Sequence, residues 1–226
     1  MDLDLTDRVY VVTGGARGLG RATADVLVAE GARVVLSGRS EEALSAAREA
    51  LGEAVEIVVG DNADPTTAAR LISAAHDRWG RLDGALVSVG GPPKGPVATI
   101  TDAQWTAAFE SVFLGAVRIG REVGRALTEG GSVCFVLSSS VRAPLADMAI
   151  SNGLLPGRIG TARVAELDAA GGDPEAARAA AVATIPLRRY GVPEEFGRVA
   201  AFVLSPAASF VSGAMVPVDG GMLRSL

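Results

Sequence analysis

Short apolar runs rich in β-branched residues alternate with alanine- and leucine-rich segments of helical length from the start of the chain. The short runs predict buried strands and the longer segments predict connecting helices, which is the pattern of repeated βαβ units on a parallel sheet. The predicted strands are residues 8–12, 33–37, 55–59, 84–88, 132–137 and 214–218. The predicted helices are residues 18–30, 41–51, 65–79, 101–128 and 194–204. We therefore expect an α/β fold with a doubly wound parallel sheet, in a single domain over residues 1–226.

Composition and charge narrow the class of function. The chain has 226 residues, a net charge of -5 and no run of basic residues, which argues against nucleic-acid and membrane-surface partners. Its first residues are too acidic for a signal peptide and no later segment is apolar over a bilayer's length, so we expect a cytoplasmic protein. The single cysteine, Cys134, lies in an apolar run, and the single histidine, His76, in a predicted surface helix. Neither a disulfide within the chain nor a metal site is expected, and small-molecule chemistry is favoured.

A glycine-rich segment joins the first predicted strand to the first predicted helix. It reads Thr13-Gly14-Gly15-Ala16-Arg17-Gly18-Leu19-Gly20. Glycines allow a tight turn and a close approach to a pyrophosphate, and the amides at the start of the helix attract its negative charge. An ordinary tight turn between a strand and a helix is the alternative. The strand-turn-helix context favours a dinucleotide site formed by Thr13, Gly14, Arg17, Gly18, Leu19 and Gly20.

The spacing of this turn, Thr-Gly, three residues, Gly, one residue and Gly, resembles the short-chain dehydrogenase/reductase family. The resemblance extends to Asp61 and Asn62 after the third strand, and to residues 186–195 and 212–221 near the end. It implies a Rossmann-like NAD(P)-binding domain in which Asp61 contacts the adenine. It also implies a homo-oligomer, either a dimer or a tetramer, and a substrate lid over residues 157–190. The family's Asn-Asn-Ala-Gly after the fourth strand is replaced by Ser88-Val89-Gly90-Gly91, which leaves Gly90 as a cofactor contact.

A second stretch resembles the family's Pro-Gly loop after the sixth strand. It spans residues 155–161, and the resemblance implies cofactor contacts from Pro156, Gly157, Ile159 and Thr161. Thr161 stands where the family's threonine contacts the nicotinamide amide.

The choice of cofactor depends on the residues after the second strand. NAD-binding members of the family carry an acidic residue there, whereas this chain has Gly38 followed by Arg39. Arg39 and Arg17 could together bind a 2′-phosphate, which favours NADP(H) over NAD(H). Two solvated surface charges are the alternative.

The family's catalytic pattern is broken. Its members pair a tyrosine with a lysine four residues later, yet the two tyrosines, Tyr10 and Tyr190, are followed at that spacing by Gly14 and Glu194. Alignment on the fifth strand places Ser138 at the catalytic serine, Ser151 at the tyrosine and Leu155 at the lysine, and the family frame of Trp105 and Gly115 places Val112 at the relay asparagine. Ser138 and Ser151 are the remaining catalytic candidates, although the serines after this strand could equally form a polar loop.

The segment between the fifth and last strands is short for the family. Residues 139–155 would have to supply a loop, a helix and a strand, and a parallel crossover needs about a dozen residues or more by itself. Residues 152–155 could form a stub of the sixth strand. We expect a helix and a strand to be missing here, by deletion or by omission from the sequence, so that the last strand lacks its neighbour.

The leading hypothesis is an NADP(H)-dependent oxidoreductase with an atypical active site, acting on a carbonyl or alcohol. The first alternative is a nucleotide-binding pseudoenzyme or regulatory protein, since the usual acid and its lysine are missing. The second is non-redox lyase or isomerase chemistry on the same fold.

Overall fold

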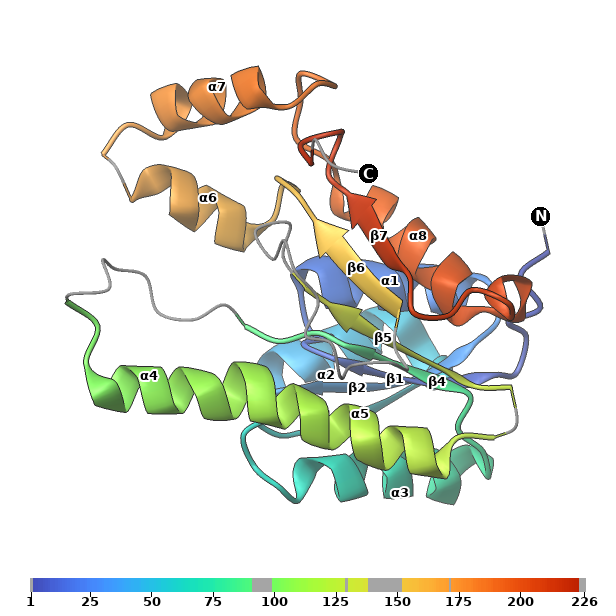
Figure 1. The fold of residues 1–226 in the computed structure, drawn as a ribbon. Coiled ribbons are helices and arrows are strands. Elements are labelled where there is room, and N and C mark those ends of the chain that lie inside the picture. The colour runs from blue at the N-terminus through green and yellow to red at the C-terminus, as the bar shows by residue number, and fades with distance from the viewer. Residues whose placement is uncertain (1, 91–98, 129, 138–151, 171, 224–226) are drawn as a thin grey trace.

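A parallel sheet in the order β3-β2-β1-β4-β5-β6-β7 forms the centre of the molecule (Figure 1). The structure is a computed structural model that describes residues 2–90, 99–128, 130–137, 152–170 and 172–223. The strands are β1 (Val9–Thr13), β2 (Arg33–Gly38), β3 (Val55–Val59), β4 (Gly84–Val87), β5 (Ser132–Val136), β6 (Asn152–Pro156) and β7 (Met215–Val218). The strand order reverses between β1 and β4, and the carboxyl ends at such a reversal are where α/β folds bind ligands. The predicted Rossmann-like architecture is confirmed.

Helices cover both faces of the sheet (Figure 1). The helices are α1 (Gly18–Ala29), α2 (Glu41–Leu51), α3 (Thr67–Trp79), α4 (Asp102–Ala108), α5 (Gly115–Ala126), α6 (Ala162–Ala169), α7 (Pro174–Thr184) and α8 (Pro193–Leu204). One core layer lies between the sheet and α1, α2 and α8, and the other between the sheet and α3 and α5. A π-helical stretch, Phe109–Leu114, joins α4 to α5, so the single helix predicted over residues 101–128 is divided and ends at Ala126.

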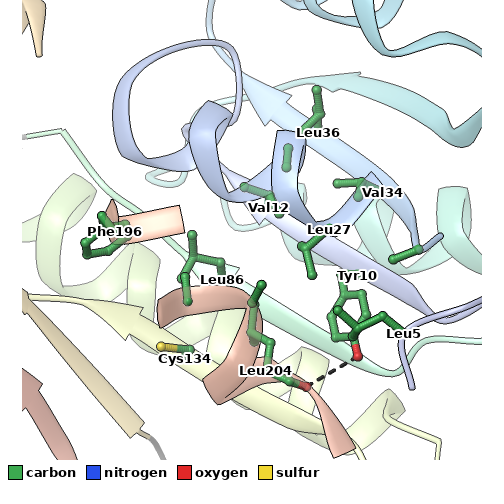
Figure 2. Packing of buried hydrophobic residues seen from close by; sticks show 14 of the residues in the cluster. Leu5, Tyr10, Val12, Leu27, Val34, Leu36, Leu86, Cys134, Phe196 and Leu204 are labelled. Atoms are coloured by element: carbon green, nitrogen blue, oxygen red, sulfur yellow. Dashed lines mark hydrogen bonds between the residues drawn. The ribbon is translucent and has the colours of Figure 1, made fainter. Parts of the chain in front are cut away.

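Alternation along each strand supplies both core layers. Val12, Leu36 and Leu86 face the layer that contains Leu27 of α1 (Figure 2). The preceding residue of each strand faces the other layer. A strand buried on both faces gives a continuous apolar run, which is why the sequence pattern located the central strands correctly.

Side chains that cap helices set several of the helix boundaries. Ser40 accepts a hydrogen bond from the amide of Ala43 (3.2 Å) and α2 begins at the next residue, as predicted. A capping box of Thr101 and Gln104 is present at the start of α4. The prediction that the third helix starts at residue 65 is wrong, because Asp64 accepts from the amide of Thr66 (2.8 Å) and holds a turn before α3 begins at Thr67.

The prediction of a missing strand is also wrong. β6 pairs in parallel with β5, with Leu154 opposite Val136, and with β7, with Leu154 opposite Val216. The last strand therefore has its neighbour. Residues 137–151 connect β5 to β6, and their number exceeds the minimum length of a parallel crossover. β6 can therefore pair with β5 although the connection is short for the family. The missing helix would fall at residues 138–151, outside the described part of the chain.

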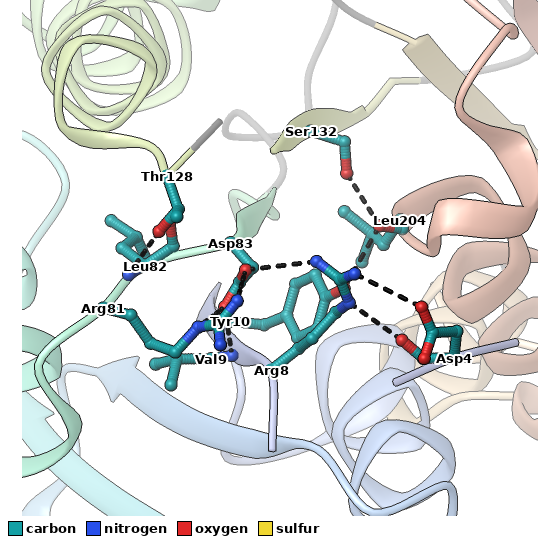
Figure 3. Close-up of polar contacts among 10 residues, drawn as sticks. All are labelled: Asp4, Arg8, Val9, Tyr10, Arg81, Leu82, Asp83, Thr128, Ser132 and Leu204. Carbon is teal, nitrogen blue, oxygen red and sulfur yellow. Dashed lines mark hydrogen bonds and ion pairs between the residues drawn. The ribbon is translucent and has the colours of Figure 1, made fainter. Parts of the chain in front are cut away.

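A polar cluster closes the amino end of the sheet, opposite the glycine-rich turn (Figure 3). The buried carboxylate of Asp83 accepts hydrogen bonds from Arg81 Nε (2.8 Å), Arg8 Nη1 (3.3 Å) and the amide of Val9 (2.9 Å). The hydroxyls of Tyr10 (3.3 Å) and Ser132 (2.9 Å) donate to the carbonyl oxygen of Leu204 at the end of α8. The cluster ties β1, β4, β5 and α8 together.

Candidate functional site

The glycine-rich turn forms a backbone cradle between β1 and α1. A Cβ atom on Gly20 would collide with the carbonyl oxygen of Gly14, and one on Gly15 would stand 2.6 Å from Cδ2 of Leu36. Gly14 and Gly18 both adopt φ +61°, a conformation that favours glycine. A side chain at Gly15 or Gly20 would push the turn away from Leu36 of β2 or separate the start of α1 from Gly14. The cradle therefore fits the pyrophosphate of a dinucleotide.

Thr13 fixes the end of β1 to the end of β4. Its side-chain oxygen donates to the carbonyl oxygen of Ser88 (2.7 Å) and accepts from the amide of Ser88 (2.9 Å). Thr13 is fully buried, so it positions the turn rather than standing open to a ligand. Sequence reasoning treated Ser88 only as a departure from the family's asparagine and missed this reciprocal pair.

Arg17 and Arg39 lie at one corner of the turn. A Cβ atom on Gly38 would stand 3.9 Å from Cβ of Ala16, so the residues that precede the two arginines are neighbours in space. Both arginines are exposed. Neither guanidinium makes a hydrogen bond or an ion pair with the described residues, whereas Arg21 and Arg33 nearby are paired with Asp25 and Asp7. The structure thus places two exposed arginines, unpaired within the described residues, on neighbouring segments of the chain.

The residues after β3 also lie beside the turn. Asn62 Nδ2 donates to the carbonyl oxygen of Ser88 (3.5 Å), the same oxygen that Thr13 contacts. The half-buried Asp61 accepts from the amide of Ala63 (2.9 Å). Gly90 is exposed after β4, with open space at its Cβ position. These three predicted contacts gather at the carboxyl ends of β3 and β4.

The loop after β6 completes the site from the other side. Pro156 ends β6, and the amide of Gly157 donates to the carbonyl oxygen of Val218 (3.0 Å). A Cβ atom on Gly157 would stand 2.7 Å from Cα of Asp219, a close approach that sequence reasoning did not find.

The rest of this loop reaches α6 and the glycine-rich turn. Ile159 is buried in the core, and Thr161 caps α6 by accepting from the amide of Val164 (3.4 Å). Cγ2 of Thr161 lies 3.8 Å from the Cβ position of Gly18. The two loops that the sequence linked to one cofactor are therefore neighbours. We use the name cofactor rim for the glycine-rich turn, Arg39, residues 61–62 and residues 156–161.

The catalytic candidates Ser138 and Ser151 lie outside the described residues. Neither tyrosine can replace them. Tyr10 is buried in β1, and its hydroxyl belongs to the polar cluster at the amino end of the sheet. Burial raises the pKa of this hydroxyl (Figure 2). Tyr190 is buried and its hydroxyl donates to Asp168 (3.1 Å). The part of the chain that the structure describes thus offers no tyrosine hydroxyl to a substrate.

Two further positions of the family's catalytic set lie within the described chain. Leu155, at the expected lysine position, is buried in β6, and Val112, at the expected asparagine position, lies half-buried in the π-helical stretch. Neither side chain can donate or accept a proton.

Comparison with known proteins settles the family. Residues 8–150 match the family model described as short chain dehydrogenase, and residues 145–223 match the model described as Enoyl-(Acyl carrier protein) reductase. The chain belongs to the short-chain dehydrogenase/reductase family. Its members are oxidoreductases that use a nicotinamide cofactor, so this chain is an oxidoreductase of that type.

Individual relatives share most of their length with this chain. Levodione reductase of Leifsonia aquatica is 34% identical over 96% of this chain and 94% of its own length. Cis-4-hydroxycyclohexanecarboxylate dehydrogenase of Sinomonas cyclohexanicum is 32% identical over 95% of this chain and 96% of its own length. The crystal structure of L-sorbose reductase from Gluconobacter frateurii, complexed with NADPH and L-sorbose, superposes with a TM-score of 0.89 at 25% identity and covers 100% of both chains.

The alignment with levodione reductase runs over 253 positions and includes 96% of the 226 residues of the chain, so the relative has more than 27 residues opposite gaps. No helix in the described ranges is long and apolar enough to cross a bilayer.

Proposed function

We propose that this short-chain dehydrogenase/reductase binds NADP(H) and transfers hydride between its nicotinamide and a carbonyl or alcohol carbon. The observation that carries the cofactor assignment is the pair of free arginines, Arg17 and Arg39, beside the contact between Ala16 and Gly38. A 2′-phosphate would offset both charges, whereas an NADH ribose would not. The turn, Asp61 and Asn62, and the loop at Pro156, Gly157, Ile159 and Thr161 would hold the rest of the cofactor.

The test compares two cofactors on two arginine variants. Arg39→Ala should weaken NADPH binding about tenfold or more, since a charge-assisted hydrogen bond contributes roughly 1.5 to 3 kcal/mol, and should change NADH binding little. Arg198→Ala removes the same charge from an exposed position on α8 and should leave both affinities unchanged. Both affinities are read by fluorescence titration of the reduced cofactors. An equal loss of NADPH and NADH affinity in Arg39→Ala contradicts the assignment.

The substrate is proposed to be a ketone or secondary alcohol. Support comes from the relatives, whose names record a reductase of levodione and a dehydrogenase of cis-4-hydroxycyclohexanecarboxylate. Levodione, cis-4-hydroxycyclohexanecarboxylate and L-sorbose are therefore the first compounds to assay, by the absorbance of NADPH at saturating substrate. Turnover of any of them supports hydride transfer.

A cofactor-binding protein without hydride transfer is the second candidate. It is favoured by Val112 and by the two tyrosines, which are engaged with Leu204 and Asp168 rather than free. Tight NADPH binding with no turnover on a broad carbonyl panel would select it. In that case Ser138→Ala and Ser151→Ala would leave NADPH binding unchanged and would have no activity to lose.

We also propose that the chain forms a homo-oligomer, a dimer or a tetramer. Trp105, Phe109 and Phe113 are spaced four residues apart and are 49%, 53% and 36% exposed, which leaves an apolar stripe along α4 and the π-helical stretch. Light scattering should show an oligomer that Phe109→Ser weakens. A monomeric wild-type protein contradicts the proposal.

A further inference from the structure

Helices α6 and α7 stand beyond the carboxyl end of β6 and pack mainly against each other (Figure 1). The structure describes every residue of both helices, and the only buried one is Asp168, in the last turn of α6. An apolar face does not hold this pair of helices to the sheet. A charged side chain occupies the position where a core residue would normally stand.

The carboxylate of Asp168 collects partners from separate segments. The hydroxyl of Tyr190 donates to both carboxylate oxygens (3.1 Å each), and Arg158 Nη1 donates to Oδ1 (3.1 Å). Asp168 and Tyr190 are 6% and 5% exposed. From α7, the guanidinium of Arg178 lies over the Tyr190 ring, 4.6 Å from its centroid. We call Asp168, Tyr190 and Arg158 the Asp168 cluster.

The charges within the cluster are satisfied. A buried carboxylate is tolerated only with a cation or several hydrogen-bond donors, and Arg158 and Tyr190 supply both. Burial, followed by the hydrogen bond to Asp168, raises the pKa of Tyr190, which keeps its hydroxyl a donor. Removing the carboxylate would leave these donors without their acceptor.

The cluster is joined to the cofactor rim by backbone hydrogen bonds. The amide of Gly160 donates to the carbonyl oxygen of Gly191 (2.8 Å), and the amide of Gly191 donates to that of Arg158 (3.0 Å). Tyr190 and Arg158 therefore belong to two paired segments, one of which carries Ile159 and Thr161. Because Thr161 is also the cap of α6, the orientation of α6 and the position of Thr161 against Gly18 are coupled.

We propose that Asp168 is a positioning residue that fastens α6 to residues 158–160 and to Tyr190, and so holds Thr161 against the glycine-rich turn. The effect on the cofactor rests on the proposed function. It should fall on the nicotinamide half, which Thr161 would face, and spare the adenosine half, which the turn and Arg39 would hold.

The experiment compares two ligands on three variants. Asp168→Asn and Tyr190→Phe disrupt the cluster, and Glu166→Gln is the matched control, since it removes one carboxylate charge from an exposed position on the same helix. The ligands are NADPH and adenosine 2′,5′-bisphosphate, which lacks the nicotinamide half. Both cluster variants should raise the NADPH dissociation constant about fivefold or more and change that of the bisphosphate less than about twofold. The control should leave both constants unchanged.

Hydrogen exchange of α6, measured without ligand, separates this inference from the proposed function. Both cluster variants should speed exchange in residues 162–169, and the control should not. If wild-type protein fails to bind NADPH, the proposed function is wrong, and the exchange data alone then decide the positioning role. Unchanged exchange in both cluster variants overturns it. Equal weakening of both ligands overturns it as well, because that pattern indicates a general loss of structure.

Discussion

Cγ2 of Thr161 lies 3.8 Å from the point where a Cβ atom on Gly18 would stand. The two residues are far apart in the sequence: Gly18 begins α1 after β1, and Thr161 precedes α6 after β6. Because the distance is an ordinary van der Waals separation, the space beside Gly18 would admit a methyl group, and what demands glycine there is its φ of +61°.

Gly18→Ala should therefore act through the backbone. We expect it to lower the free energy of unfolding by about 1 kcal/mol and to weaken NADPH binding, since relief of the strain would turn the amides of the first turn of α1. Gly124→Ala is the matched control, because Gly124 is helical in α5 with nothing near its Cβ position, and alanine there should stabilise by up to about 1 kcal/mol. Denaturant unfolding and NADPH titration check both variants. The same sign of stability change in both would contradict this interpretation.

Gly38→Asp should shift the cofactor preference. A Cβ atom at position 38 would stand 3.7 Å from Leu44 and 3.9 Å from Ala16, so a side chain fits without rearrangement. A carboxylate there would repel a 2′-phosphate and accept hydrogen bonds from ribose hydroxyls. We expect NADPH affinity to fall about tenfold or more and NADH affinity to rise, as measured by titration with both cofactors.

The control for that change is Gly38→Asn, which adds a side chain of the same size without charge. It should leave the preference for NADPH largely intact. If the asparagine variant shifts the preference as far as the aspartate variant, the side chain acts by bulk and the electrostatic argument fails.

Local signals explain which parts of the fold the sequence predicted. β3 and α2 have the predicted boundaries, and the start of α2 is fixed by its neighbouring cap residue, Ser40. β6 was less visible because Asn152 and Gly153 are poor strand formers and the strand is defined by its pairing with β5 and β7.

The residues of the candidate site also divide into those with a local signal in the sequence and those without one. The glycine-rich turn was predicted from its spacing and its position between a strand and a helix, and Arg39 from the acidic residue that NAD-binding members of the family carry after the second strand. The Asp168 cluster was not, since Asp168 and Tyr190 are separated along the chain and meet only through the pairing of Gly191 with the loop after β6. An aspartate on a helix whose other residues are exposed or half-buried gives no signal in the sequence that it is buried.

Cys134 should resist alkylation in the folded protein. Burial in β5 raises the pKa of its thiol to about 12. Because the side chain is fully buried, a reagent in solution does not reach the sulfur atom. Only the thiolate reacts, so the rate with iodoacetamide should stay near zero from about pH 7 to pH 9 and appear at once in denaturant. Because the folded pKa is above the unfolded value, the thiol's contribution to stability is lost as the pH rises toward 12. Rapid native labelling near pH 8 would show that this strand opens readily.

Asp83→Asn should destabilise the fold without altering the site. The carboxylate is buried, 2% exposed, between Arg8 and Arg81, and it also accepts the amide of Val9 (Figure 3). An asparagine keeps one acceptor and turns an amide toward a guanidinium, so we expect a loss of roughly 3 kcal/mol in the free energy of unfolding. Asp25→Asn, in the half-exposed pair with Arg21 on α1, should cost no more than about 0.5 kcal/mol. Since Asp83 precedes β4 at the end of the sheet opposite the glycine-rich turn, the folded fraction of the variant should bind NADPH with wild-type affinity. A loss of affinity at a temperature where the variant is fully folded would mean that the two ends of the sheet are coupled, which a rigid parallel core does not predict.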